Sequence, residues 1–203
     1  MQNDQHVCEA DRCLAFLADT PDAGLKFGDK PESLHLVGYA DTNDASDKQN
    51  RSSTNSYDFV FGGAAVSWTI QCIKCMTLSS MEPEYIAATK ADKVARRLHF
   101  LLAVFELFNT GMPTVFNVDN QSAIAAAKGL GLKGNLKHME RHYIWLQQMV
   151  KREKIGLQYA PTIEQPADFI TKTLHFPAFN MCSVALGQVH LADVGDGDED
   201  VQQ

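Results

Sequence analysis

The chain has 203 residues, of which 45% are apolar, and its formal net charge is −7. This length and composition predict one globular domain, and no segment approaches the roughly 20 apolar residues of a membrane-spanning helix. The N-terminus has neither the basic start nor the apolar stretch of a secretory signal, so we expect an intracellular protein that is not secreted.

The hydrophobic pattern predicts strands first in succession and then in alternation with helices. The expected helices cover residues 9–18, 80–108, a segment from Asn120, 135–153 and 165–174. The expected strands cover residues 33–41, a hairpin over 55–70, 114–118 and 155–160. This order predicts an α/β protein with one mixed sheet that helices cover.

The acidic residues are concentrated at the C-terminus. Five of the 25 acids lie between residues 193 and 200, so the rest of the chain holds 18 basic and 20 acidic residues. The acidic end is expected to be disordered. It also leaves open a weaker alternative, in which the chain is an acidic-tailed interaction protein.

A basic segment lies between Lys128 and Lys154, where seven Lys and Arg residues accompany two acids. Such a segment is typical either of contact with phosphate or of a solvated helix face, and composition leaves both open. The first alternative predicts that Lys137, His138 and Arg141 bind nucleic acid.

Four carboxylates occupy positions from which they could converge. Asp41 and Asp119 each end a predicted strand, whereas Glu84 and Asp168 each lie in the first turn of a predicted helix. Taken singly, such an acid is more often a helix cap or a surface residue than a metal ligand. Together, four ionised groups would repel one another unless hard cations such as Mg²⁺ or Mn²⁺ bound between them.

Glu84 begins the apolar face of the helix expected over 80–108. Pro83 falls in the first turn, where its missing N–H has no intrahelical acceptor, so the helix tolerates it. The residues that follow Glu84 at helical spacing are Ala88, Ala91, Ala95, Leu98 and Leu102. Glu84 is therefore expected to point toward the sheet, and Glu82 away from it.

Several motifs occur together in a fixed order. They are "GYAD" (38–41), "SSMEPEYIAA" (79–88), "VDNQSAI" (118–124), "LKHMERHY" (136–143) and "YAPTIEQPADFITKTL" (159–174). In this order the chain resembles the ribonuclease H domain of copia-type LTR retrotransposon Pol polyproteins. The resemblance implies an RNase H-like fold with a five-stranded mixed sheet and helices on both faces.

The resemblance also implies an activity and a site. The implied enzyme is an endonuclease that uses two Mg²⁺ ions, or Mn²⁺, to hydrolyse the RNA strand of RNA–DNA hybrids during reverse transcription. Its catalytic and metal-binding residues would be Asp41, Glu84, Asp119 and Asp168. Asp41 would bridge both ions, Asp168 would help to hold the ion beside the water, and Glu84 with Asp119 would hold the other ion.

The same resemblance suggests how the chain is organised. Residues 1–30 look like the end of a reverse-transcriptase connection, 31–175 like the RNase H domain, and 176–203 like a divergent, disordered acidic tail. The implied partners are an RNA–DNA hybrid, reverse transcriptase and other Pol domains, but no membrane, in cytoplasmic virus-like particles or in the nucleus. The alternative is a decayed, inactive fragment of a retrotransposon that still binds nucleic acid.

Overall fold

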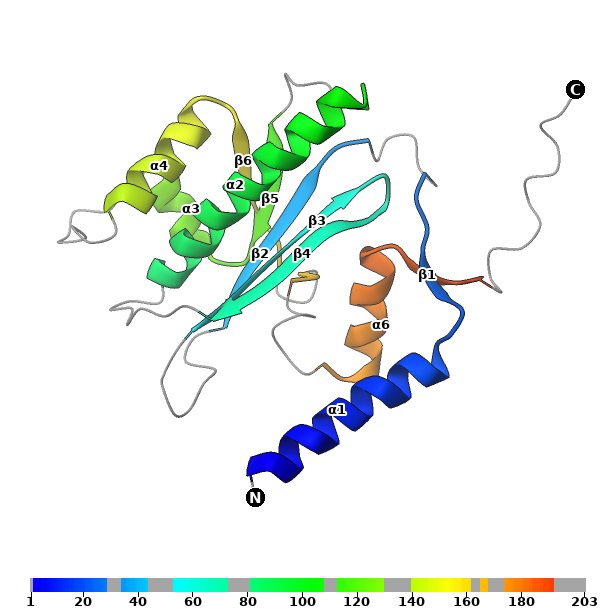
Figure 1. The fold of residues 1–203 in the computed structure, drawn as a ribbon. Coiled ribbons are helices and arrows are strands. Elements are labelled where there is room, and N and C mark those ends of the chain that lie inside the picture. Colours follow the sequence, from blue (N-terminus) through cyan, green and yellow to red (C-terminus); the bar gives the residue numbers. More distant parts are fainter. Residues whose placement is uncertain are drawn as a thin grey trace, which may run out of the picture.

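The computed structural model describes residues 2–28, 34–43, 53–72, 81–107, 113–129, 140–161, 165–167 and 174–191. Its main sheet has five strands in the order β4-β3-β2-β5-β6 (Figure 1). These strands are β2 (Val37–Asn43), β3 (Thr54–Phe61), β4 (Ala64–Cys72), β5 (Thr114–Val118) and β6 (Ile155–Tyr159). The pairs β2–β3 and β3–β4 are antiparallel, whereas β2–β5 and β5–β6 are parallel. The predicted five-stranded mixed sheet is therefore confirmed.

The strands form close to where the hydrophobic alternation predicts them. The expected hairpin is β3 and β4, which are joined at Gly62 and Gly63 with φ angles of 63° and 89°. Positive φ is a conformation that glycine adopts without steric cost, so this pair of residues suits the tight connection.

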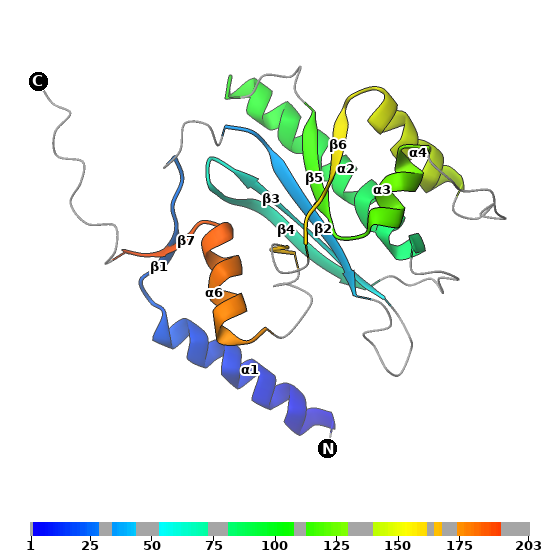
Figure 2. The same cartoon turned by 180° about the vertical axis from the view of Figure 1, so that it is seen from behind.

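Three helices pack around β2, β5 and β6 (Figure 2). They are α2 (Met81–Val104), α3 (Gln121–Ala127) and α4 (Glu140–Lys151). The apolar face predicted for the helix over 80–108 is confirmed in α2, where Ala88, Ala91 and Ala95 are buried. None of the helices in the described part of the chain has both the length and the apolar character that a bilayer crossing requires.

The core between α2 and the sheet depends on a close approach at Gly38. The rings of Phe59 and Phe116 meet edge to face there, with centroids 5.7 Å apart. A Cβ added at Gly38 would lie 2.9 Å from atoms of both rings. Glycine in the "GYAD" motif thus leaves room for two aromatic side chains from the neighbouring strands.

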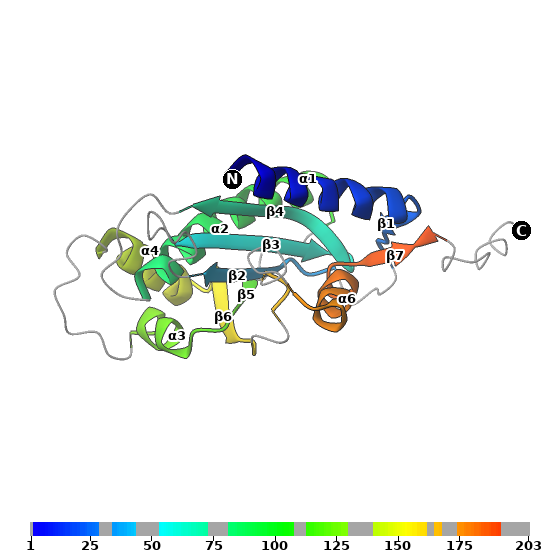
Figure 3. The same ribbon diagram turned by 90° about the horizontal axis from the view of Figure 1, so that it is seen from below.

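The remaining elements come from the first and last described segments of the chain, and α1 and α6 lie on the other side of β3 and β4 from α2 (Figure 3). They are α1 (Gln2–Asp19), β1 (Ala23–Leu25), α6 (Phe176–Ala185) and β7 (Gln188–His190). β1 pairs antiparallel with β7. The first and last described segments of the chain thus form one unit.

The prediction of a disordered tail from residue 176 is wrong for residues 176–191. This stretch forms α6 and β7 because it is apolar and finds partners in the N-terminal segment. The ring of Phe179 meets that of Phe16 edge to face, with centroids 5.7 Å apart, and Cys182 is buried. Residues 192–203, including the acids from Asp193 onward, lie outside the described residues.

Gly187→Ala is expected to destabilise the fold by about 2 kcal/mol or more, because Gly187 couples α6 to the hairpin. Its φ is 79°, and a Cβ would lie 2.5 Å from the carbonyl oxygen of Gly63. Urea unfolding should reveal the loss, with Gly156→Ala as the control, since a Cβ at Gly156 meets nothing within 4 Å. Equal stability of the two variants would contradict this packing.

Candidate active site

The carboxyl ends of two neighbouring parallel strands each carry an aspartate. The paired residues of β2 and β5 are Val37 with Val115, Gly38 with Phe116 and Tyr39 with Asn117. Asp41 of β2 and Asp119, which directly follows β5, each lie two residues beyond the last of these pairs. The structure therefore places both predicted site residues at the carboxyl-terminal ends of β2 and β5, on the same side of the sheet.

Asp41 points to the face of the sheet opposite the α2 core. Ala40 belongs to the hydrophobic core, and successive side chains of a strand point to opposite faces. Asp41 is only 1% exposed, and its register partner on β3 is Ser56. The strand thus holds this carboxylate at a fixed, largely dehydrated position.

The N-cap of α3 is Asn120 rather than Asp119. The backbone N–H of Ala123 donates to Asn120 Oδ1 at 3.0 Å, which is the N3-to-cap hydrogen bond. Asp119 is partly buried and directly precedes this cap. The cap hydrogen bond from the N–H of Ala123 is therefore accepted by Asn120, and the role of Asp119 stays a prediction.

The other predicted site residues are described in part or not at all. Glu84 lies in the first turn of α2 and Arg141 in the first turn of α4, but their side chains lie outside the description. Asp168, Lys137 and His138 lie outside the described residues. Their roles therefore stay predictions.

The segment that leads to Asp168 is attached to the strands that carry the aspartates. Gln165 Nε2 donates to the carbonyl oxygen of Ala40 at 2.9 Å and to that of Asn117 at 3.1 Å. Ser56 Oγ donates to the carbonyl oxygen of Ala167 at 3.0 Å. Gln165 and Ser56 were not identified from the sequence, and the signal that points to Gln165 is its place in the "EQPAD" motif.

A further buried acid, Asp58, lies near Asp41 on the same face of the sheet. Asp58 is two residues along β3 from Ser56, so its side chain shares the face of Asp41. Asp58 is 0% exposed, and neither carboxylate oxygen has a hydrogen-bond partner within the described residues. Burial raises the pKa of Asp58 to about 8, so its carboxyl group is mostly protonated at neutral pH.

The pKa of Tyr39, which is the register partner of Asp58, is also raised. Burial is the main cause, and the charge on the neighbouring Asp58 adds to it. The face of the sheet that holds Tyr39, Asp41 and Asp58 is thus poorly solvated, and an uncompensated negative charge there is costly.

The donor chemistry of this edge fits a hard divalent cation. Asp41 and Asp119 supply carboxylate oxygens from two rigid strand ends, and Mg²⁺ and Mn²⁺ prefer oxygen ligands. Within the part of the chain that the structure describes, no group of three or more His, Cys, Asp or Glu residues could hold a metal ion. Glu84 and Asp168 would have to complete such a set.

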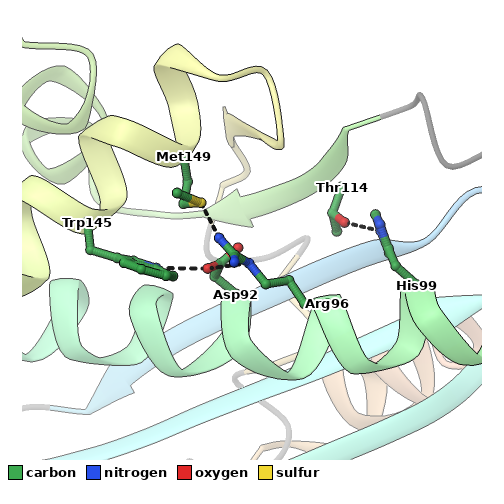
Figure 4. A network of polar contacts seen from close by, with 6 residues as sticks. All are labelled: Asp92, Arg96, His99, Thr114, Trp145 and Met149. Carbon is green, nitrogen blue, oxygen red and sulfur yellow. Dashed lines mark hydrogen bonds and ion pairs between the residues drawn. The ribbon is translucent and has the colours of Figure 1, made fainter.

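A second set of polar contacts lies between α2, α4 and the start of β5 (Figure 4). Asp92 is 1% exposed, accepts a hydrogen bond from Trp145 Nε1 at 2.8 Å, and pairs with Arg96 at 3.3 Å. Arg96 also contacts the sulfur of Met149, and His99 contacts the hydroxyl of Thr114. Because Thr114 begins β5 whereas Asp119 follows its end, this network is separate from the candidate active site.

Comparison with known proteins gives relatives but no matching family model. The retrovirus-related Pol polyprotein from transposon TNT 1-94 of Nicotiana tabacum is 35% identical over 174 residues, which are 86% of this chain and 13% of that protein. The Pol polyprotein from transposon RE2 of Arabidopsis thaliana is 29% identical over 189 residues, or 93% of this chain and 13% of that protein. The chain thus spans only a small part of these curated relatives.

The second alignment also reaches beyond a predicted boundary. It leaves out only 14 of the 203 residues, so it must include residues 176–189. The alignment thus extends past residue 175, the predicted end of the RNase H domain, into α6 and β7.

The fold has a counterpart among solved structures. The N-terminal RNase H domain of Rv2228c from Mycobacterium tuberculosis, solved as a fusion with maltose-binding protein, matches with a TM-score of 0.51 and 14% sequence identity. The match covers 74% of this chain and 95% of that structure. The chain is therefore a relative of the retrovirus-related Pol polyproteins of plant transposons, and it has the RNase H fold.

Proposed function

We propose that the chain is a metal-dependent endonuclease that hydrolyses the RNA strand of RNA–DNA hybrids, as the RNase H part of a copia-type Pol polyprotein. The observation that supports it most is that Asp41 and Asp119 each lie two residues beyond Tyr39 and Asn117, the last paired residues of two adjacent parallel strands. The segment before Asp168 is hydrogen-bonded to β2 and β5, the strands of these two aspartates, which favours a third acid beside them.

The proposed site uses four carboxylates in two kinds of position. Asp41 and Asp119 are held by strand ends, whereas Glu84 and Asp168 approach from α2 and from the segment after Ala167. Two bound Mg²⁺ ions would activate water and stabilise the leaving oxygen of the phosphodiester. The four acids would hold these ions. We expect their carboxyl groups to lie within about 8 Å of one another.

The proposed substrate is cut in its RNA strand only, with reverse transcriptase and other Pol domains as partners of the intact polyprotein. The test is incubation of the purified chain with a hybrid labelled on either strand, in Mg²⁺ or in EDTA. We expect the RNA strand to be cut in Mg²⁺ alone, and single-stranded RNA and duplex DNA to stay intact. A folded chain that leaves the hybrid intact would overturn the proposal and favour the decayed fragment.

Lys137, His138 and Arg141 are proposed to contact the phosphates of the hybrid. Arg141→Ala is then expected to weaken binding and to reduce the slope of log affinity against log salt by about 1, because one fewer counterion is released. Fluorescence anisotropy at several salt concentrations measures this slope. Lys151→Ala is the matched control, since it removes a positive charge about 15 Å away on the same helix. An equal change in both variants would count against a local contact at Arg141.

A further inference from the structure

We propose that Gln165 is a positioning residue whose side-chain amide clamps β2 to β5 beside the candidate active site and fixes the segment that leads to Asp168. The catalytic part of this inference rests on the proposed function, whereas the clamp itself does not. Four observations support it: the two hydrogen bonds of Gln165, the point where the strands stop pairing, the bond from Ser56, and burial.

The geometry defines what the amide does. Gln165 Nε2 donates to the carbonyl oxygens of Ala40 and Asn117, at 2.9 and 3.1 Å. Both partners are acceptors, so the nitrogen rather than the oxygen of the amide must face them. A single NH₂ group thus bridges two different strands. Gln165 is 0% exposed, so water does not compete for these bonds.

The bridge lies where the pairing of the two strands ends. The last paired residues of β2 and β5 are Tyr39 and Asn117. The acceptor Ala40 is one residue beyond that pair and directly precedes Asp41. Gln165 therefore links β2 and β5 at the position from which the chain continues to both aspartates.

Ser56 adds a second attachment from the neighbouring strand. Its hydroxyl donates to the carbonyl oxygen of Ala167 at 3.0 Å, and Ser56 is the register partner of Asp41. Ala167 is itself fully buried and directly precedes Asp168. Three strands, β2, β5 and β3, thus hold both ends of a three-residue segment.

This arrangement has a consequence for the acids. The segment 165–167 is far from the strands in sequence, and Gln165 is 125 residues from Ala40. Without the clamp, a carboxylate that follows residue 167 would be free to occupy more positions relative to Asp41 and Asp119. Residues that fix the position of metal ligands typically change metal affinity or activity by about 10- to 100-fold when replaced.

The test uses Gln165→Met, which keeps the length of the side chain and removes the donor. The first readout is hydrogen–deuterium exchange of the peptide covering 162–172, which we expect to be at least about tenfold faster than in the parent. The second is the Mg²⁺ concentration that gives half-maximal cleavage, which we expect to rise about tenfold. The KM for the hybrid should stay the same, and excess Mg²⁺ should restore most of the rate.

Two further variants separate positioning from general loss of stability. Trp145→Phe removes the hydrogen bond to buried Asp92 between α4 and α2, so it should lower the melting temperature without changing the Mg²⁺ requirement. Ser56→Ala is the milder change at the clamp and should reproduce the effect of Gln165→Met in part, which covers the case where Gln165→Met fails to fold. All assays are run well below each variant's melting temperature.

The outcomes decide between the clamp and a purely structural role. Unchanged exchange over 162–172 in both Gln165→Met and Ser56→Ala would overturn the clamp. If Gln165→Met exchanges faster but needs no more Mg²⁺ for cleavage than Trp145→Phe does, the positioning role is overturned. If the parent chain neither cleaves hybrid nor binds a divalent ion, the proposed function fails, and the exchange difference alone decides whether Gln165 fixes the segment.

Discussion

Asp119→Asn is expected to lower the rate of hybrid cleavage at least about 100-fold while changing the free energy of unfolding by no more than about 1 kcal/mol. The substitution keeps the shape of the side chain and removes the negative charge that a divalent ion requires. The cap of α3 remains, because Asn120 rather than Asp119 accepts the hydrogen bond from the N–H of Ala123. Cleavage rates and urea unfolding of the same preparations measure the two effects.

The neighbouring residue supplies the matched control. Asn120→Ala removes the cap and should cost about 1 kcal/mol of stability, yet the folded fraction should cleave as the parent does. Asn120→Asp should keep both properties, because aspartate caps helices as well as asparagine does. An Asp119→Asn variant that cut hybrid at the parent rate would remove Asp119 from the proposed site.

Asp58→Asn is expected to stabilise the chain by a few kcal/mol at pH 8 and much less at pH 5. Burial raises the pKa of Asp58 from 3.8 to about 8 in the folded state. Between these values the folded chain keeps a proton that the unfolded chain has lost, so stability falls as pH rises and levels off above the folded pKa. Asparagine is neutral throughout and lacks this dependence.

Urea unfolding from pH 5 to pH 9 measures the difference between Asp58→Asn and the parent. The gain should grow with pH, by at most about 1.4 kcal/mol per pH unit, and level off near pH 8. Asp92→Asn is the matched contrast, because Asp92 is equally buried but is paired with Arg96 and Trp145. That variant should lose stability. A gain for Asp58→Asn that does not change with pH would contradict a protonated Asp58.

The sequence was sufficient to predict the five-stranded sheet and that Asp41 and Asp119 lie toward the carboxyl ends of two of its strands. Asp41 lies near the end of β2 and Asp119 directly follows β5, and neighbouring parallel strands have their carboxyl ends on the same side of a sheet. The apolar face of α2 followed from its 3.6-residue spacing, which is a local property. The resemblance to Pol polyproteins implied the five-stranded mixed sheet, whereas the order of its strands comes from the structure.

The sequence could not assign contacts between distant residues. Asp119 and Asn120 are both good cap residues, and only the geometry assigns the cap to Asn120. An isolated acid in a strand, such as Asp58, usually faces water, and its burial depends on how the sheet is covered. The order of residues 176–191 likewise depends on α1 and β1, which lie more than 150 residues earlier in the chain.

The most direct measurement is a titration of the chain with Mn²⁺, followed by the loss of the free-ion electron paramagnetic resonance signal. Mn²⁺ stands in for Mg²⁺ here, because both prefer oxygen ligands. We expect about two Mn²⁺ ions to bind per parent chain and to be displaced by Mg²⁺, and we expect weaker binding in Asp41→Asn and in Asp119→Asn. Equal Mn²⁺ binding by the parent and both variants would contradict a metal site at the ends of β2 and β5.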